Sequence, residues 1–458
     1  MREALASEIR NALRYVRANW LVAKVLASYI GLYTLYKLFG ADRIRARIDR
    51  THERNAQRVL DGILELKAVY IKLGQVLSVM SQVLPPVFSE KLVGLQDAVP
   101  PHPYKDIERR FREEFGKTPQ EMGLALNPVP LASASLGQVH RATDPDGRVL
   151  AIKVQYPDIE KIVEMDLAVL ARVTRILDWF FPDFHYHRIR EQIVDVVRRE
   201  LDYRSEARNM ATFAANFADD PDVLCPEVVP EYTSGRVLAM TFMEGCKIGN
   251  RKALIDAGID PQAVVKKLAH IFFKQVLKDR LFHADPHPGN FLVQPGPKIV
   301  VLDFGAVEPI REELMKGMRL VFLGYISRND QLVLNGVEVM GFKSLTGDRA
   351  VFERSVKHYF EKILRYRPED LAKMSPDVIR DFADLKQLDV SFTDLARAFQ
   401  YPEGYFYIER TMLLLLGLCM TLDYTLDPLI VGAPYAMQLI LETAEPGSLV
   451  IPPPPAQA

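Results

Sequence analysis

The stretch from His283 to Asn290 constrains the chain most. Its eight residues, HADPHPGN, include two prolines and a glycine, which exclude a helix and predict a rigid loop. A hairpin that pairs 291–293 with 300–302 would place Asn290 and Asp303 at the same end. Amide and carboxylate oxygens there can bind one hard cation.

The spacing of Asp285 and Asn290 equals that of the aspartate and asparagine in the protein-kinase loop H-R-D-x-x-x-x-N. The tripeptide 303–305, Asp-Phe-Gly, matches the metal-binding signature of those enzymes. These matches predict Asp285 beside the transferred phosphoryl group and Asn290 with Asp303 on the metal.

The two histidines of the loop suggest a metal site of another kind. His283 and His287 do not share a helix face, however, and no third nitrogen or sulfur ligand stands nearby in the sequence. We therefore expect them to hold the loop by hydrogen bonds.

Upstream, the strand 150–153, Leu-Ala-Ile-Lys, matches the V-A-I-K strand whose lysine contacts nucleotide phosphates. It follows the segment 132–139, which aligns with G-x-G-x-x-G-x-V but has alanine at the first two glycine positions. Because the Cβ of alanine disfavours positive φ, we expect nucleotide geometry to differ from that of common kinases. The predicted nucleotide contacts of this loop are Ala132, Ser133, Ala134 and Ser135.

A kinase also needs a helical glutamate that pairs with the strand lysine. The helix predicted over 187–213 contains Glu200, Asp202 and Glu206. The last two are four residues apart and share a face, whereas Glu200 points elsewhere. The kinase-like order of the motifs favours a pair between Lys153 and Glu206.

The order of elements predicts an α+β fold with a small sheet lobe before a larger helical lobe. A hairpin is expected from 136–142 and 149–154, and a helix over 261–279. The apolar run 412–420 is too short to cross a bilayer and is expected to form a buried core helix. After residue 305 the chain lacks A-P-E, so the platform for a peptide substrate is missing from the sequence.

Two N-terminal segments favour helices. The stretch Trp20–Phe39 is apolar but interrupted by Lys24 and Lys37, so a helix that docks its aromatic residues on the protein is expected ahead of membrane contact. Apolar residues recur at steps of four and three from Val59 to Met80, which predicts one long helix that ends before Pro85-Pro86.

Composition excludes some classes of function. Lys and Arg total 58 against 59 acidic residues, so the chain lacks the positive field that draws nucleic acid. Three cysteines without a CxxC pair indicate a reducing compartment, and the first residues lack a secretory signal. We expect a cytoplasmic protein; the sequence leaves its oligomeric state open.

Together these motifs resemble the UbiB/AarF family of atypical kinases, the aarF-domain-containing kinases associated with coenzyme Q and other isoprenoid lipids. The resemblance runs from about residue 60 to about residue 428. Its parts are the KxGQ at 72–75, the alanine-rich loop at 132–135, the ExD at 200–202 and the HxDPHPGN at 283–290.

The resemblance implies a bilobal protein-kinase-like fold in which the KxGQ helix covers the active site. Lys72, with Gln75 on the same helix face, would reach towards Glu200 and Asp202 and obstruct a protein substrate. It further implies ATP hydrolysis or phosphorylation of a small or lipidic target, coupled to quinone metabolism and to peripheral membrane contact on the inner face. The segments are then a helical extension, the KxGQ region, the N-lobe, the C-lobe and a flexible proline-rich tail, at 1–50, 51–125, 126–245, 246–440 and 441–458.

These inferences predict Mg²⁺ and ATP (or ADP) between the lobes, with Lys153 on phosphates and Asp285 positioning water or a substrate hydroxyl. Two alternatives stay open. One is a nucleotide-dependent scaffold for lipid-biosynthetic enzymes; the other is a small-molecule phosphotransferase like those that modify aminoglycosides, which would not be expected to carry the sequence 72–75.

Overall fold

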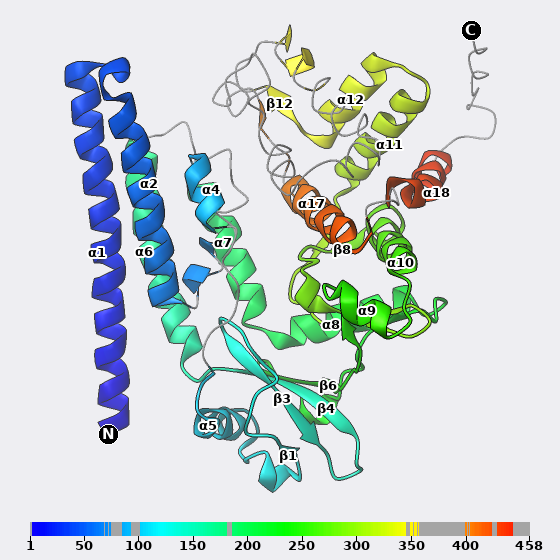
Figure 1. Ribbon diagram of the computed structural model, residues 1–458. Coiled ribbons are helices and arrows are strands. Elements are labelled where there is room, and N and C mark those ends of the chain that lie inside the picture. Colours follow the sequence, from blue (N-terminus) through cyan, green and yellow to red (C-terminus); the bar gives the residue numbers. More distant parts are fainter. Residues whose placement is uncertain are drawn as a thin grey trace. The chain divides into compact units, whose positions relative to one another are not determined.

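The computed structural model describes residues 2–67, 69–71, 73–74, 85–92, 101–180, 186–344, 349–350, 352–354, 356, 399–400, 402, 404–423 and 428–442. The protein has the predicted α+β fold, with helices and mostly antiparallel strands (Figure 1). It divides into two compact units, each described by itself below. Unit 1 comprises 1–208 and 227–242, and unit 2 comprises 209–226 and 243–458.

Unit 1 contains a five-stranded antiparallel sheet in the order β1-β3-β4-β6, with β2 paired to β3. The predicted hairpin is confirmed, because β3 and β4 pair from Gly137 with Gln155 to Thr143 with Val149. Helix α5 (Tyr104–Phe115) buries Ile107 and Phe111 against the apolar side of this sheet. The strands are β1 (Ala125–Leu126), β2 (Ala132–Ser133), β3 (Gly137–Thr143), β4 (Val149–Gln155) and β6 (Val237–Thr241).

The helices of unit 1 differ from the sequence prediction in two places. Helix α6 (Ile159–Phe180) was not foreseen. The predicted helix 187–213 is two helices, α7 (Tyr186–Glu200) and α8 (Tyr203–Asn216). The break is stabilised by Tyr203, whose N–H donates to the carbonyl of Gly235 at 2.9 Å. Glu200 therefore ends one helix while Glu206 lies in the next.

The prediction of one long helix over 59–80 is also wrong. Helix α2 (Ala41–Leu66) ends at Leu66, and Lys67 adopts a φ of 56°. Left-handed backbone ends a helix, and it redirects the chain that follows. Val69 and Leu73 then pack towards α6 and α7, while residues 75–84 lie outside the described part of the chain.

Helix α1 (Arg2–Phe39) lies along α2, as Figure 1 shows. Its inner side buries Ala18. The expected docking of its aromatic residues is wrong for most of them, since Trp20, Tyr33 and Phe39 are 62%, 54% and 51% exposed. In the part of the chain that the structure describes, Ala12–Phe39 is the one helical stretch with the length and hydropathy of a membrane span.

Unit 2 has a four-stranded sheet in the order β5-β10-β9-β7 and the pair β8–β11. The predicted hairpin of β9 with β10 is present, but it joins Phe291 to Val301 and Val293 to Ile299, so its second strand lies one residue earlier than the expected 300–302. The strands are β5 (Val223–Leu224), β7 (Cys246–Lys247), β8 (Leu281–His283), β9 (Phe291–Gln294), β10 (Lys298–Val301), β11 (Val307–Pro309), β12 (Lys343–Ser344) and β13 (Phe399–Gln400).

Unit 2 also contains helices. The helix predicted over 261–279 is α10 (Pro261–Phe273), continued by a π-helical turn at Lys274–Asp279. The apolar run 412–420 lies in α17 (Tyr405–Leu422), where Leu415, Leu418 and Cys419 are buried, so this prediction is confirmed. The others are α9 (Arg251–Asp256), α11 (Glu312–Ile326), α12 (Asp330–Met340) and α18 (Pro428–Leu441), while α4 (Pro86–Leu92) belongs to unit 1.

Candidate functional site

In unit 1, β4 and α8 bring the predicted lysine and glutamate together. The Nζ of Lys153 lies 2.9 Å from both carboxylate oxygens of Glu206. Glu206 is 4% exposed, and the lysine side chain is 17% exposed above the ring of Tyr203. The pair predicted from motif order is therefore present, and its burial makes it a strong, oriented contact.

The alanine-rich loop is a tight hairpin between β2 and β3. The N–H of Ala134 donates to the carbonyl of Gly137 at 2.8 Å, so this amide bonds within the loop. No residue from 132 to 136 has positive φ, as expected where alanine replaces glycine. Gly137 keeps its glycine for another reason: a Cβ there would lie 2.5 Å from the carbonyl oxygen of Val154.

The other residues of the loop vary in exposure. Ser135 is buried at 4% exposure, Ala132 is exposed, and Ser133 lies between these extremes. The hydroxyl of Tyr156 donates to the carbonyl of Ala134 at 3.2 Å, which ties the loop to the core beneath it. The loop is thus held in shape by its own hairpin and by one tyrosine.

The ExD residues lie at the break between α7 and α8. The carboxylate of Asp202 accepts from the N–H of Arg204 at 3.1 Å, so Asp202 sits at the start of α8 rather than on a face shared with Glu206. The carbonyl of Glu200 accepts from the side chain of Gln155 at 3.3 Å. Lys72, their predicted partner, and Gln75 both lie outside the described residues.

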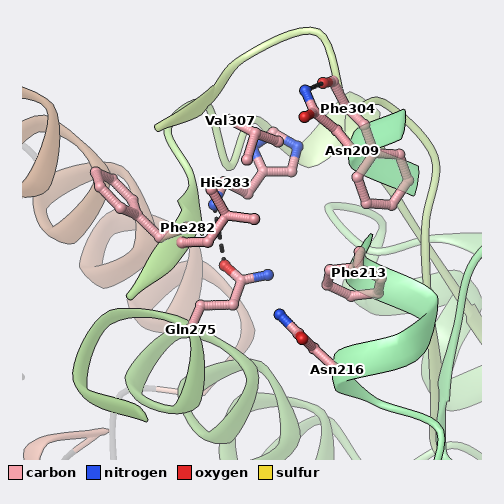
Figure 2. A pocket seen from close by; sticks show the side chains of 9 residues that line it. Asn209, Phe213, Asn216, Gln275, Phe282, His283, Phe304 and Val307 are labelled. Carbon is pink, nitrogen blue, oxygen red and sulfur yellow. Dashed lines mark hydrogen bonds between the residues drawn. The ribbon is translucent and has the colours of Figure 1, made fainter. Parts of the chain in front are cut away.

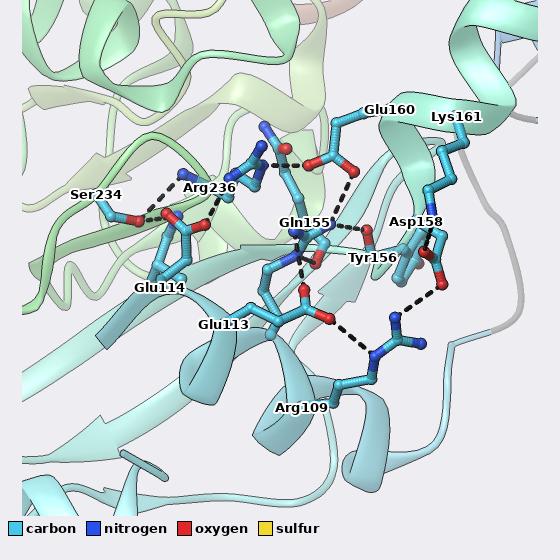
Figure 3. A network of polar contacts seen from close by, with 12 residues as sticks. Arg109, Glu113, Glu114, Gln155, Tyr156, Asp158, Glu160, Lys161, Ser234 and Arg236 are labelled. Carbon is cyan, nitrogen blue, oxygen red and sulfur yellow. Dashed lines mark hydrogen bonds and ion pairs between the residues drawn. The ribbon is translucent and has the colours of Figure 1, made fainter. Parts of the chain in front are cut away.

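A network of charged side chains supports the far end of β4 (Figure 3). Arg110 is 3% exposed, and its guanidinium donates to the carbonyls of Gln155 and Tyr156 and to Glu160. Arg236 bonds both Glu160 and Glu114, the latter at 2.7 Å. The network joins α5, the end of β4, the first turn of α6 and β6, and so fixes the strand that carries Lys153.

In unit 2 the loop 284–290 lies between β8 and β9. The side-chain amide of Asn290 donates to the carbonyl of Asp285 at 3.0 Å, which leaves its Oδ1 as the atom to face a cation. The N–H of Leu302 donates to the carbonyl of Asn290 at 2.9 Å. Asp303 follows at once, and its carboxylate accepts from the N–H of Gly305 at 2.9 Å. The hairpin therefore places Asn290 and Asp303 at one end, as expected.

These donors suit Mg²⁺ only if a nucleotide supplies further oxygens. Across the described ranges, no group of three or more His, Cys, Asp or Glu side chains is arranged to hold a metal. Mg²⁺ prefers one or two protein oxygens together with phosphate and water. The amide of Asn290 and the carboxylate of Asp303 match that demand.

The two histidines hold the loop by hydrogen bonds, as predicted. The Nδ1 of His283 accepts from the N–H of Asp285 at 3.1 Å, and the Nδ1 of His287 accepts from the N–H of Gly289 at 3.1 Å. Burial lowers the pKa of His283, while Asp303 and Asp285 oppose that shift. Through its Nδ1, His283 holds the backbone of the loop.

Arg410 is a site residue that sequence reasoning missed. From α17, its Nη2 donates to Oδ1 of Asp285 at 2.8 Å and its Nη1 to the carbonyl of Ala284 at 3.4 Å. The two residues are separated by 125 positions, so no local motif announces the contact. This ion pair fixes the orientation of the Asp285 carboxylate. The kinase-like spacing predicts that this carboxylate positions the nucleophile.

Behind the loop lies a small, mostly apolar cavity (Figure 2). Gln275, from the π-helical turn, accepts from the N–H of His283 at 3.0 Å. Asn209 donates to the carbonyl of Phe304 at 2.9 Å. The cavity has room for about one water, so it belongs to the support of the loop and not to a nucleotide site.

A family model described as the ABC1 atypical kinase-like domain matches residues 94–337. The Arabidopsis thaliana protein ACTIVITY OF BC1 COMPLEX KINASE 8, chloroplastic, is 29% identical over 411 residues, which cover 84% of this chain and 54% of that protein. A probable protein kinase UbiB from Marinobacter nauticus is 35% identical over 250 residues, which cover 53% of this chain and 46% of the relative.

A solved structure is also similar. The Mycobacterium tuberculosis protein Rv3197, in complex with erythromycin, aligns with a TM-score of 0.59 and 27% identity. The alignment covers 88% of this chain and 100% of the other. The two kinases named above are longer: the matches span about half of each.

Proposed function

The chain belongs to the ABC1 atypical kinase-like family, and from that premise we propose that it binds Mg–ATP and transfers the terminal phosphoryl group to water or to a small or lipidic hydroxyl. The observation that carries the proposal is the buried pair of Lys153 with Glu206. A lysine held by two equal 2.9 Å contacts on a strand beside a hairpin loop suits a phosphate-binding role.

Each unit contains residues with a proposed role. In unit 1, Lys153 binds phosphate oxygens and Glu206 keeps its ammonium in place. In unit 2, Asn290 and Asp303 hold Mg²⁺, whose charge offsets the charge that develops on the phosphates. Asp285, oriented by Arg410, positions the attacking hydroxyl or water.

For the acceptor, we propose an isoprenoid quinone precursor or another lipid rather than a protein. The missing A-P-E and the resemblance to UbiB support this choice. We further propose that the protein acts inside the cell with peripheral membrane contact. The exposed aromatic residues of α1 support such contact, because Trp and Tyr favour the interface between lipid and water.

A second candidate is a nucleotide-dependent scaffold. The contact of Arg410 with Asp285 favours it, because a guanidinium on one carboxylate oxygen competes with a nucleophile for the same group. In that case ATP would stabilise one conformation for partner enzymes without turnover.

The test is phosphate release from Mg–ATP by the purified protein, with and without liposomes and phenolic quinone precursors. We expect Asp285→Asn to lower release by about 10²- to 10³-fold with folding intact, and Asp303→Asn to abolish Mg²⁺-dependent nucleotide binding. Asp256→Asn, on the exposed end of α9, is the matched control and should change neither. Release that survives Asp285→Asn would contradict the catalytic role, and metal-dependent binding that survives Asp303→Asn would contradict the metal site.

A further inference from the structure

Helix α1 reaches the core of unit 1 through one arginine. The guanidinium of Arg14 donates to both carboxylate oxygens of Asp166 in α6, at 3.1 and 2.5 Å. It also donates to the carbonyl of Leu66, the last residue of α2, and to that of Lys67 at 3.4 Å. The side chains of Arg14 and Asp166 are 17% and 3% exposed. We call this set of contacts the Arg14 latch.

The contacts of the Arg14 latch lie at the C-terminal end of α2. Carbonyls at a helix C-terminus lack partners within the helix and carry partial negative charge, which a guanidinium offsets. Lys67 has left-handed backbone there, which costs energy in a residue with a Cβ. The side chain of Arg14 also lies 5.5 Å from the ring centroid of Tyr70. The latch therefore holds both the turn and the first residues that follow it.

From this turn a continuous set of contacts reaches the alanine-rich loop. Val69 is buried in one cluster with Leu136 and Tyr156. The N–H of Tyr156 donates to the carbonyl of Leu136 at 3.0 Å, and its hydroxyl to that of Ala134 at 3.2 Å. Every step lies within unit 1. A displacement of residues 69–71 would thus remove packing from beneath the loop.

We propose that α1 acts as a strap: the Arg14 latch positions residues 66–67 and 69–71 under the alanine-rich loop, and release of α1 loosens that loop. The consequence for nucleotide rests on the proposed function, in which residues 132–135 contact ATP. Arg14 and the alanine-rich loop are far apart in sequence. Through the strap, α1 in the N-terminal extension controls the affinity of the loop for nucleotide. Anything that draws α1 away from α2 and α6 would weaken ATP binding.

The first test is hydrogen exchange on the full chain. Arg14→Gln leaves the carboxylate of Asp166 buried without its partner, so exchange should rise at least about tenfold in α1, in 66–71 and in 131–137. Arg17→Gln is the matched control, because Arg17 lies one turn away on α1 and pairs with Glu65 at 3.2 Å, yet both side chains are about 60% exposed. It should leave exchange unchanged.

A second variant releases α1 without touching a charge. At Gly62 in α2, a Cβ would lie 2.2 Å from a methyl group of Leu21, so Gly62→Phe wedges the two helices apart. We expect the exchange pattern of Arg14→Gln. A rise confined to α1 in both variants, with 131–137 protected as in the wild type, would overturn the strap.

ATP affinity then separates this inference from the proposed function. If the wild type binds Mg–ATP, both release variants should weaken binding by about three- to tenfold, and Arg17→Gln should not. Unchanged affinity in both would refute the nucleotide coupling. If the wild type binds no nucleotide, the proposed function fails, and exchange in 131–137 still decides whether the strap exists.

Discussion

The two units hold their predicted site residues by different means. In unit 1, a buried ion pair joins Lys153 to Glu206 across 53 positions of sequence. In unit 2, three side-chain bonds within the loop 283–290 join residues two to five positions apart, such as Asn290 to Asp285. The first arrangement depends on long-range packing and the second on local chain geometry. Substitutions in unit 1 should therefore reduce stability first, and those in unit 2 should reduce chemistry first.

The largest expected effect on stability tests the first half of that contrast. Glu206→Gln leaves a buried ammonium without its counter-charge, which should lower the free energy of unfolding by about 3–5 kcal/mol. Glu65→Gln removes the carboxylate of the exposed pair with Arg17 and should cost at most about 1 kcal/mol. Denaturant unfolding followed by circular dichroism measures both. Equal losses of stability in Glu206→Gln and Glu65→Gln would show that burial does not strengthen the pair of Lys153 with Glu206.

A pH series extends the contrast to the Arg14 latch. Burial raises the pKa of Asp166 to about 6, against the opposing effect of Arg14. Because this folded pKa exceeds the unfolded value, the folded state binds the proton more tightly, and the group's contribution to stability rises as pH falls through about 6. Between pH 7 and pH 5, the free energy of unfolding of the wild type should rise by about 1 kcal/mol relative to that of Asp166→Asn. If the difference in the free energy of unfolding between the wild type and Asp166→Asn stays constant with pH, the pKa of Asp166 is not raised.

In unit 2 the predicted effect falls on turnover. Lysine cannot reproduce the planar fork of Arg410, so Arg410→Lys should let Asp285 rotate and lower kcat by about tenfold, with KM for ATP and the melting temperature unchanged. Arg280→Lys is the control, because Arg280 makes a 2.8 Å pair with Glu312 at 41% and 52% exposure. If Arg410→Lys instead raised the KM for ATP and lowered the melting temperature, Arg410 would be a structural residue only.

The same contrast explains what the sequence could predict. Within 283–305 the prolines, glycines and strand pattern specify the loop and the hairpin, so the positions of Asn290 and Asp303 follow from local rules. The pair of Lys153 and Glu206 was predictable because both belong to motifs of known order. These predictions concern the positions of the residues.

Contacts without a motif were not predictable. Arg14 and Asp166 are 152 positions apart, and Arg410 and Asp285 are 125 apart, so neither pair has a local signal. The apolar repeat from residue 59 onward continues past Leu66, yet α2 ends there, because Val69 is buried in the cluster with Tyr156 instead. Periodicity identifies which residues are buried but not which neighbour buries them.

The smallest expected effect tests the alanine-rich loop itself. Ala134 lies outside the left-handed region and bonds within the hairpin, so Ala134→Gly should lower stability by only about 0.5–1 kcal/mol, through added backbone freedom in the unfolded chain. Freed of its Cβ, the loop should approach phosphates more closely, and the preference between ATP and ADP should shift.

Gly137→Ala is the matched control, three positions along the same hairpin. Its Cβ would lie 2.5 Å from the carbonyl oxygen of Val154, so overpacking should cost about 1–3 kcal/mol without any gain in phosphate contact. Titration of both variants with ATP and ADP, beside thermal unfolding, separates the two effects. If Ala134→Gly leaves nucleotide preference and autophosphorylation unchanged, the methyl groups of this loop do not set its phosphate geometry, and unit 1 holds the nucleotide through Lys153 alone.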